Sequence, residues 1–301
     1  MRQYLILGVG ILAISSASIL IKLCAAPSMV IAMYRLAFAS LFFIITAGVK
    51  KNNPLQDFHK KDLRLAFFSA LFLCVHFAAW ITSLSYTSVA SSVVLVSTSP
   101  VFVAIGSIFF LKEKPGKLLI WGIAFTLIGA VILSYRELGV GKNSLFGNAL
   151  ALAGAIGIAG HYLIGKVLRA RIDTFSYVTV VYSITALFLI LISGLLRNSF
   201  FDYNANTYLL FFLIAFVPQV IGHTTLNWAL KLFSAATVAV ITLSEPIGAS
   251  ILAFFLLGEK ITGMQSLGGL VILTGVAFAL RGENSVIFQH KGTKNHEGSL
   301  R

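Results

Sequence analysis

The sequence predicts an all-α integral membrane protein with ten transmembrane helices, arranged as two inverted repeats of five helices each. The chain of 301 residues is 58% hydrophobic and only 11% charged, whereas a soluble domain is about half apolar and about a quarter charged. Uncharged runs such as 89–111 are long enough to cross a hydrocarbon core about 30 Å thick. Hydrophobicity and run length therefore indicate a membrane protein, and an internal repeat indicates how it is built.

The repeat relates residues 84–137 to residues 230–283 by a constant shift, without gaps. We count five hydrophobic spans in each half, and an odd number of spans turns the second half over in the membrane. Inverted repeats of this kind build sites near the bilayer midplane that open to alternate sides. The matched pairs include Ser88/Ser234, Pro100/Pro246, Glu113/Glu259, Gly122/Gly268, Gly129/Gly275 and Glu137/Glu283.

The ten predicted spans follow one another with mostly short connectors, so neighbouring helices must form antiparallel hairpins. We assign residues 1–137 to the first repeat and 138–283 to the second, and expect a disordered, basic cytoplasmic tail over 284–301. The spans cover residues 4–24, 28–49, 65–86, 89–111, 117–135, 145–167, 174–196, 207–230, 235–257 and 262–280.

The net charge of +13 is explained by the placement of the basic residues. If the N-terminus is inside, most of the Lys and Arg residues fall in connectors on the inner side, which is the distribution that orients membrane proteins. We therefore expect a multi-pass protein of the cell (inner) membrane with both termini in the cytoplasm. Nucleic acid is not expected as a partner.

The first span resembles a secretory signal, because Arg2 is followed by an apolar run. That run is longer than a usual signal segment, residues 25–27 form a poor cleavage site, and Lys22 does not fit a lipobox ending at Cys24. We expect a retained helix. Cys24 and Cys74 lie in apolar runs and are expected to be small buried hydrophobes rather than disulfide or metal ligands.

Two sequence features point to close packing and to helix breaks. Small residues let helix backbones approach closely in lipid, and the sixth span is rich in them; a smooth face that slides during alternating access is the other explanation. Pro100 and Pro246 fall mid-span at equivalent positions, where paired helix breaks indicate a binding site or simple bends. The small residues are Gly147, Ala151, Gly154, Ala155, Gly157, Ala159 and Gly160.

Glu245 is the most informative polar residue within the spans. It precedes Pro246 near the middle of the ninth span, where a charge costs several kcal/mol unless it is hydrated or paired. The first repeat has Ser99 at the matching position, so this carboxylate is not a product of the repeat. We expect Glu245 to carry a proton in coupled transport or to pair with a basic substrate; a bond to a neighbouring helix is the alternative.

The eighth span places Gln219, His223 and Asn227 at four-residue intervals, which predicts one shared polar face bordered by Trp228. The third span, its equivalent, carries His76 with Trp80 one turn later. A polar stripe on an apolar helix should face a cavity or another helix rather than lipid. We expect the third and eighth spans to line one cavity from opposite halves, although buried histidines bonded within the core remain an alternative.

Several motifs of other protein classes are missing from the sequence. It has no Walker A stretch, no dinucleotide fingerprint and no HExxH motif. It has no run that resembles a potassium-channel selectivity filter. These absences argue against a nucleotide-driven pump, an enzyme and an ion channel. No cofactor and no metal are expected from the sequence.

Several features occur together: ten short-looped spans in two halves, Arg35 in the second span, the segment SLSYTSVASSVVLVSTSPVF (83–102), SEP at 244–246, and EK at 113–114 and 259–260. Together they resemble the EamA branch of the drug/metabolite transporter superfamily, over about residues 4–281. The resemblance implies a central pocket between the halves and the efflux of amino acids or related metabolites, with proton or exchange coupling in several members. Carried onto this chain, the pocket candidates are Tyr34, Arg35, His76, Trp80, Ser97, Ser99, His161, Gln219, His223, Asn227, Trp228, Thr242 and Glu245.

The sequence therefore predicts a secondary transporter that exports small polar or amphipathic metabolites by alternating access at a midplane cavity. Amino acids or their derivatives are the favoured class of cargo. Its partners are a small-molecule substrate and the lipid bilayer, and a homodimer is left open. In this scheme Arg35 meets a substrate carboxylate, and His76 and His223 relay protons or hydrogen-bond the substrate. The alternatives are a membrane-embedded enzyme that uses the histidines and Glu245, and a membrane sensor or partner that does not transport.

Overall fold

The computed structural model describes residues 2–135, 143–257 and 261–298 of the chain. Within these residues nine helices are long and apolar enough to cross a membrane. The fifth predicted span is a shorter apolar helix over Lys117–Leu133. The predicted all-helical membrane fold with ten spans is confirmed.

The first half of the chain contains five predicted spans, two of them divided. Ser16 separates two helices in the first span, where its hydroxyl donates to the Ala13 carbonyl. The elements are α1 (Arg2–Ser15), α2 (Ala17–Leu23), α3 (Ser28–Val49), the 3₁₀ helix η1 (Pro54–Asp57), α4 (Lys60–Ser83), α5 (Val89–Val96), α6 (Ser99–Gly106), the π-helix η2 (Ser107–Leu111) and α7 (Lys117–Ser134).

The second half repeats this order with the opposite direction through the membrane. Its eighth span contains a π-helical segment, in which hydrogen bonds run from residue i to i+5, and its ninth span is divided. The elements are α8 (Ser144–Arg169), α9 (Thr174–Leu195), α10 (Ala205–Ile214), the π-helix η4 (Ala215–His223), α11 (Thr224–Leu232), α12 (Ala235–Thr242), α13 (Glu245–Leu257) and α14 (Gly263–Gly298).

Helix ends within each half are fixed by side-chain caps. α4 begins at Lys60, several residues before its predicted start, because the Asp62 carboxylate accepts a hydrogen bond from the His59 N–H at 2.9 Å. Ser88 and Ser234 occupy matching positions in the repeat, and each caps the helix that follows it, α5 and α12. The repeat therefore preserves capping as well as hydrophobic pattern.

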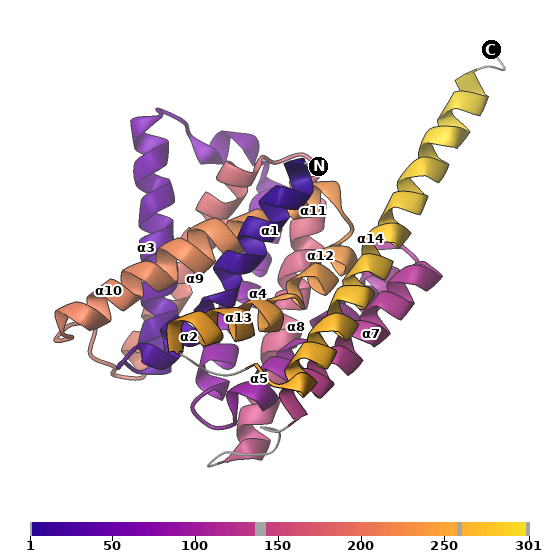
Figure 1. The fold of residues 1–301 in the computed structure, drawn as a ribbon. Coiled ribbons are helices and arrows are strands. Elements are labelled where there is room, and N and C mark those ends of the chain that lie inside the picture. The colour runs from indigo at the N-terminus through magenta and orange to yellow at the C-terminus, as the bar shows by residue number, and fades with distance from the viewer. Residues whose placement is uncertain (1, 136–142, 258–260, 299–301) are drawn as a thin grey trace.

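The two halves are interleaved rather than placed side by side. α8 of the second half packs along α4 of the first, α3 packs along α9, and α1 packs against η4 (Figure 1). The small residues of α8 allow this: a Cβ added to Gly157 would lie 2.7 Å from the His76 N and 2.8 Å from the Phe72 carbonyl oxygen. These distances favour packing as the reason for the small-residue face.

α7 and α14, the last spans of the two halves, lie together at one edge of the molecule (Figure 1). Gly129 faces Gly268, and Gly122 faces Gly275; an added Cβ on either residue of a pair would lie 2.7–2.8 Å from the carbonyl oxygen of the other. In the repeat, Gly122 matches Gly268 and Gly129 matches Gly275. At the crossing, each glycine faces the member of the other matched pair on the opposite helix. The crossing therefore has the two-fold relation expected of an inverted repeat.

The disordered tail expected over 284–301 stays a prediction. The helix α14 is assigned from Gly263 to Gly298. Residues 299–301 lie outside the described residues. So do Glu137 and the predicted domain boundary at 137/138, together with Glu259 and Lys260 of the second EK pair.

We expect Gly129→Ala to destabilise the protein by about 1–3 kcal/mol, because a methyl group there forces α7 and α14 apart. Gly275→Ala should have a similar effect. The measurement is the thermal unfolding midpoint of the purified protein in mild detergent.

The matched control is Gly8→Ala, because Gly8 lies on α1 with no atom within 4 Å of an added Cβ. Its midpoint should equal or slightly exceed that of the wild type, since Ala is the better helix former. Equal midpoints for Gly8→Ala and Gly129→Ala would contradict the crossing described here.

Candidate functional site

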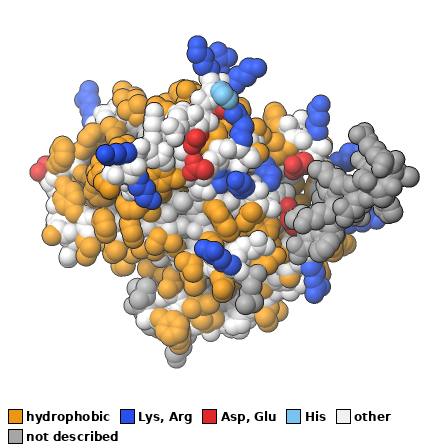
Figure 2. Space-filling view, turned by 90° about the horizontal axis from the view of Figure 1, so that it is seen from above, with side chains coloured by type: hydrophobic (Ala, Val, Ile, Leu, Met, Phe, Trp, Pro, Cys, Tyr) orange, Lys and Arg blue, Asp and Glu red, His pale blue; other side chains and the backbone are white. Residues whose placement is uncertain are grey.

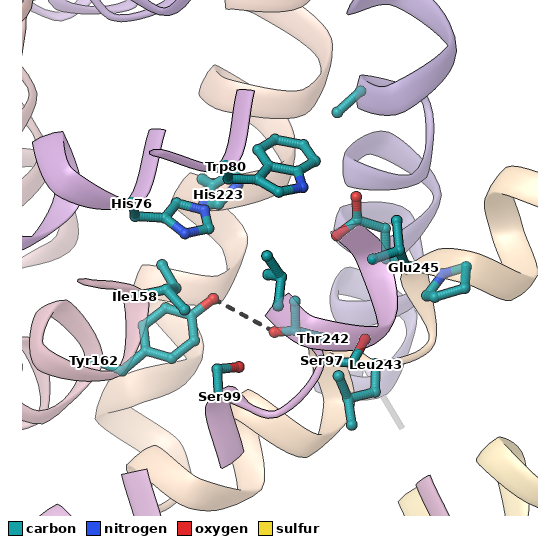
Figure 3. Close-up of a pocket in the computed structure, with 14 residues that line it drawn as sticks. His76, Trp80, Ser97, Ser99, Ile158, Tyr162, His223, Thr242, Leu243 and Glu245 are labelled. Carbon is teal, nitrogen blue, oxygen red and sulfur yellow. Dashed lines mark hydrogen bonds between the residues drawn. The ribbon is translucent and has the colours of Figure 1, made fainter. Parts of the chain in front are cut away.

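A cavity lies between the two halves and is lined by residues from both (Figure 3). Its wall combines hydroxyl, imidazole and carboxylate groups with aliphatic and aromatic surface, as small-molecule sites do. The lining residues are Ala17, His76, Trp80, Val93, Val96, Ser97, Ser99, Ile158, Tyr162, His223, Thr242, Leu243, Glu245 and Pro246.

Two helix breaks at matching positions of the repeat meet at this cavity. The fourth span is interrupted between α5, which ends at Val96, and α6, which begins at Ser99; the ninth is interrupted between Thr242 and Glu245. Each break stands just before a proline, which cannot donate to the carbonyl four residues back. Those carbonyls belong to Val96 and Thr242, and both residues line the cavity.

Glu245 is the one carboxylic acid among the lining residues, and it is the first residue of α13. The N-terminus of a helix favours a negative charge. The Glu245 carboxylate forms no hydrogen bond to another described residue, and in Figure 3 it lies across the cavity from the imidazole of His76. This carboxylate is therefore available to a proton or to a cationic group in the cavity.

His76 is held in one tautomer by the backbone. Its Nδ1 lies 2.9 Å from the Gly154 carbonyl oxygen, which can only accept, so Nδ1 carries the proton. The ring stacks against Trp80 with centroids 5.8 Å apart. The neutral ring therefore offers the lone pair of Nε2 as an acceptor.

Tyr162 was not predicted from the sequence, yet it lines the cavity from α8. Its hydroxyl lies 3.4 Å from the Thr242 hydroxyl, which links α8 to the break in the ninth span (Figure 3). The signal in the sequence was weak: Tyr162 directly follows the predicted His161 on a helix of small residues. Val93, Val96, Ile158 and Leu243 were missed because an apolar residue in a span carries no signal of its own.

His161 and Asn227 are brought together, but away from the cavity wall. His161 Nε2 donates to Asn227 Oδ1 at 3.0 Å, and its Nδ1 accepts from the Ser69 hydroxyl at 2.9 Å. The Ser69 hydroxyl also bonds Tyr177 at 2.8 Å, and the Asn227 amide donates to the Tyr182 hydroxyl at 3.2 Å. These five residues form a buried network that joins α4, α8, α9 and α11.

Arg35 and Gln219 form a second buried pair. The Arg35 Nε donates to Gln219 Oε1 at 2.7 Å, and its guanidinium lies over the Phe77 ring at 4.3 Å from the centroid. Of Gln219, His223 and Asn227, only His223 lines the cavity, while Gln219 and Asn227 bond other side chains within the protein.

The remaining predicted residues lie outside the lining set. Tyr34 donates to the Phe200 carbonyl at 2.6 Å and stacks on Phe211. Trp228 is half-buried against the hydrophobic core, and Pro100 is buried at the start of α6. Of the predicted site residues, the structure places eight at the cavity: His76, Trp80, Ser97, Ser99, His223, Thr242, Glu245 and Pro246.

Within the described residues no group of three or more His, Cys, Asp or Glu side chains is placed to hold a metal ion.

A family model described as "EamA-like transporter family" matches the chain twice, over residues 3–135 and 145–281. The chain belongs to the EamA-like transporter family. The two matched segments correspond to the two halves of the fold, and the family places this multi-pass membrane protein among transporters.

Curated relatives of this EamA protein carry transporter names. It is 27% identical to an "Uncharacterized transporter" of Clostridium kluyveri, across 78% of this chain and 80% of that protein. It is 24% identical to a "Probable amino-acid metabolite efflux pump" of Escherichia coli, across 83% of this chain and 84% of that protein. One solved crystal structure matches with a TM-score of 0.78 at 16% identity, over 94% of this chain and 99% of that one. It shows the same fold.

We expect Asn227→Leu to destabilise the protein by about 1–3 kcal/mol, because His161 Nε2 and the Tyr182 hydroxyl would lose a partner in a buried environment. The measurement is the thermal unfolding midpoint in detergent. Thr224→Val is the matched control, since the Thr224 hydroxyl makes only a 3.4 Å contact with Tyr182 and a 3.4 Å contact with the Gln219 carbonyl. A smaller loss for Asn227→Leu than for Thr224→Val would show that the network does not stabilise the fold.

Proposed function

We propose that this protein is a secondary transporter that exports small polar or amphipathic metabolites, with amino acids or their derivatives as the favoured class of cargo. The cargo binds in the cavity between the halves, which opens to alternate sides as the halves rock. The observation that carries this proposal is the convergence of two repeat-equivalent helix breaks on one cavity that contains Glu245. Discontinuous helices near the midplane of an inverted repeat are typical transporter sites.

The chemistry of the wall supports a cargo with both polar and apolar parts. Trp80, Ile158 and Leu243 provide apolar surface, while Glu245 and His76 Nε2 provide acceptors. No Lys or Arg is among the lining residues. A protonated amine would therefore be attracted to Glu245, and the apolar part of the cargo would lie against the aliphatic and aromatic wall.

Glu245 is proposed as the coupling group. A proton and a cationic cargo compete for one carboxylate, so release of one can accompany binding of the other. The relatives named as efflux pumps for amino-acid metabolites support both the cargo class and the outward direction.

The proposed location is the inner membrane, with both termini in the cytoplasm. Figure 2 looks onto the face that carries the N-terminus and shows Lys and Arg side chains spread over it. A basic inner face agrees with the bias that orients membrane proteins. The apolar side chains exposed on the helices, such as Phe109 and Leu195, would then face lipid.

We expect Glu245→Gln to reduce amino-acid flux in reconstituted vesicles at least tenfold and to remove its dependence on the pH gradient, because the amide neither ionises nor attracts an amine. The measurement is counterflow of radiolabelled amino acids with and without a pH gradient. Asp202→Asn is the control: Asp202 is an exposed loop carboxylate that is not among the residues lining the cavity.

Unchanged flux and unchanged pH dependence in Glu245→Gln would contradict the role of this carboxylate. Ligand binding without flux in wild-type vesicles would instead favour a membrane sensor over a transporter.

We expect Lys51→Cys to be protected from a membrane-impermeant thiol reagent in intact cells, and Phe201→Cys to be labelled. Lys51 and Phe201 are both exposed and lie at opposite ends of the bundle in the proposed orientation. Cys24 and Cys74, both buried, would first be replaced by Ala. Permeabilised cells serve as the labelling control, and the reverse pattern would overturn the orientation.

A further inference from the structure

Arg35 is a charged side chain that the protein buries completely and partners only in part. Its relative exposure is 0%, and among the described residues neither Nη1 nor Nη2 has a hydrogen-bond partner. The Nε2 of its neighbour Gln219 is likewise buried without a partner. Buried donors are nearly always satisfied in native structures, so three neighbouring nitrogen atoms without protein partners mark a place suited to an added acceptor.

The guanidinium is held in a fixed position. Gln219 Oε1 accepts from Nε at 2.7 Å, and the Phe77 ring lies 4.3 Å from the guanidinium carbon. Because Gln219 already accepts from Nε and the Phe77 ring covers one face of the guanidinium, Nη1 and Nη2 remain as a planar pair of donors. That geometry suits the two oxygen atoms of a carboxylate.

None of the described residues supplies this carboxylate. Glu245 is the acidic group whose charge acts on Arg35, but the two form no direct ion pair. The ion pair found among the described residues joins Arg171 to Asp62, on other elements. A buried cation without a bonded anion is costly, which makes an external carboxylate a suitable occupant.

Aromatic rings separate Arg35 from the cavity. The guanidinium lies on the Phe77 ring. The centroid of that ring is 5.2 Å from the centroid of the His223 ring and 4.8 Å from that of the His76 ring. Both histidines line the cavity. The donors of Arg35 are therefore one ring layer behind the cavity wall. A ligand in the cavity reaches them when Phe77 and His223 move apart.

The segment that would move is η4, which carries both Gln219 and His223 and contains Pro218. π-helical turns within α-helices are uncommon and are frequently found at functional sites. Its counterpart in the first half, α4, is a regular α-helix throughout. Rewinding of η4 would shift His223 and Gln219 relative to Phe77, without breaking α10 or α11.

We propose that Arg35 Nη1 and Nη2 with Gln219 Nε2 form a subsite for the carboxylate of the cargo, which is covered in this structure by Phe77 and His223. The cargo would then be a small carboxylate whose other end carries an amine or hydroxyl group directed to Glu245 and His76. This assignment rests on the proposed transport function for its role in the cycle, but the subsite itself can be tested separately.

The first test places a carboxylate permanently against the Arg35 guanidinium, beside the subsite. Gln219→Glu would bond Nε and one Nη side by side and neutralise the buried charge, so its thermal unfolding midpoint should rise by about 3 °C or more above that of the wild type. Gln219→Met, of similar shape but without polar atoms, is the matched control and should lower the midpoint. A fall in Gln219→Glu equal to that in Gln219→Met overturns the proposal, whatever the cargo is.

The second test adds carboxylates from solution. Sodium salts of acetate, benzoate, leucine and phenylalanine are compared with equal sodium chloride, by the midpoint of the whole protein in detergent. At least one carboxylate should raise the midpoint of the wild type above that in chloride, and none should raise that of Gln219→Glu. No carboxylate effect on the wild type, or an equal effect of chloride, overturns the proposal; the latter would indicate a general anion site.

Flux separates this proposal from the transport function. If Gln219→Glu vesicles still transport the stabilising carboxylate at the wild-type rate, the subsite is wrong and the transporter assignment stands. If wild-type vesicles show no flux but both midpoint results hold, the subsite stands and the transport function fails.

Discussion

A polar side chain in a hydrocarbon environment needs a hydrogen-bond partner or a cavity, and the interior of this protein is organised around that constraint. His161 and Asn227 satisfy it within the protein, through Ser69, Tyr177 and Tyr182. His76 and Glu245 satisfy it at the cavity. Arg35 satisfies it in part, through Gln219 and the Phe77 ring. These hydrogen bonds join helices of the first half to helices of the second half.

The repeat supplies a symmetric framework, and function enters where the symmetry is broken. Both halves place a helix break before a proline, and both breaks reach the cavity. Only the second break has a carboxylate, Glu245, where the first has Ser99. The third and eighth spans differ in the same way, since α4 is regular while η4 is π-helical. Two similar halves thereby form a cavity with two chemically distinct sides.

Glycine contacts hold this framework without polar bonds. α7 and α14 meet at four glycines, and α8 meets α4 at a run of small residues. Backbones that approach so closely gain dispersion contacts, which drive helix association where lipid removes the hydrophobic effect. In the proposed cycle, these smooth contacts allow the halves to rock while the helix breaks absorb the change in backbone angle.

The sequence by itself determined the ten spans, the inverted repeat and the importance of the breaks at Pro100 and Pro246, because hydrophobic length and self-similarity are properties of the chain alone. It also selected most polar residues of the interior. Only the tertiary structure decided which of them face the cavity, since spacing shows which residues share a helix face but not what that face meets. Gln219, His223 and Asn227 are the clearest case: Gln219 bonds Arg35, Asn227 bonds His161, and only His223 lines the cavity. Tyr162 is the converse case, because only the packing of α8 against the ninth span brings its hydroxyl to Thr242.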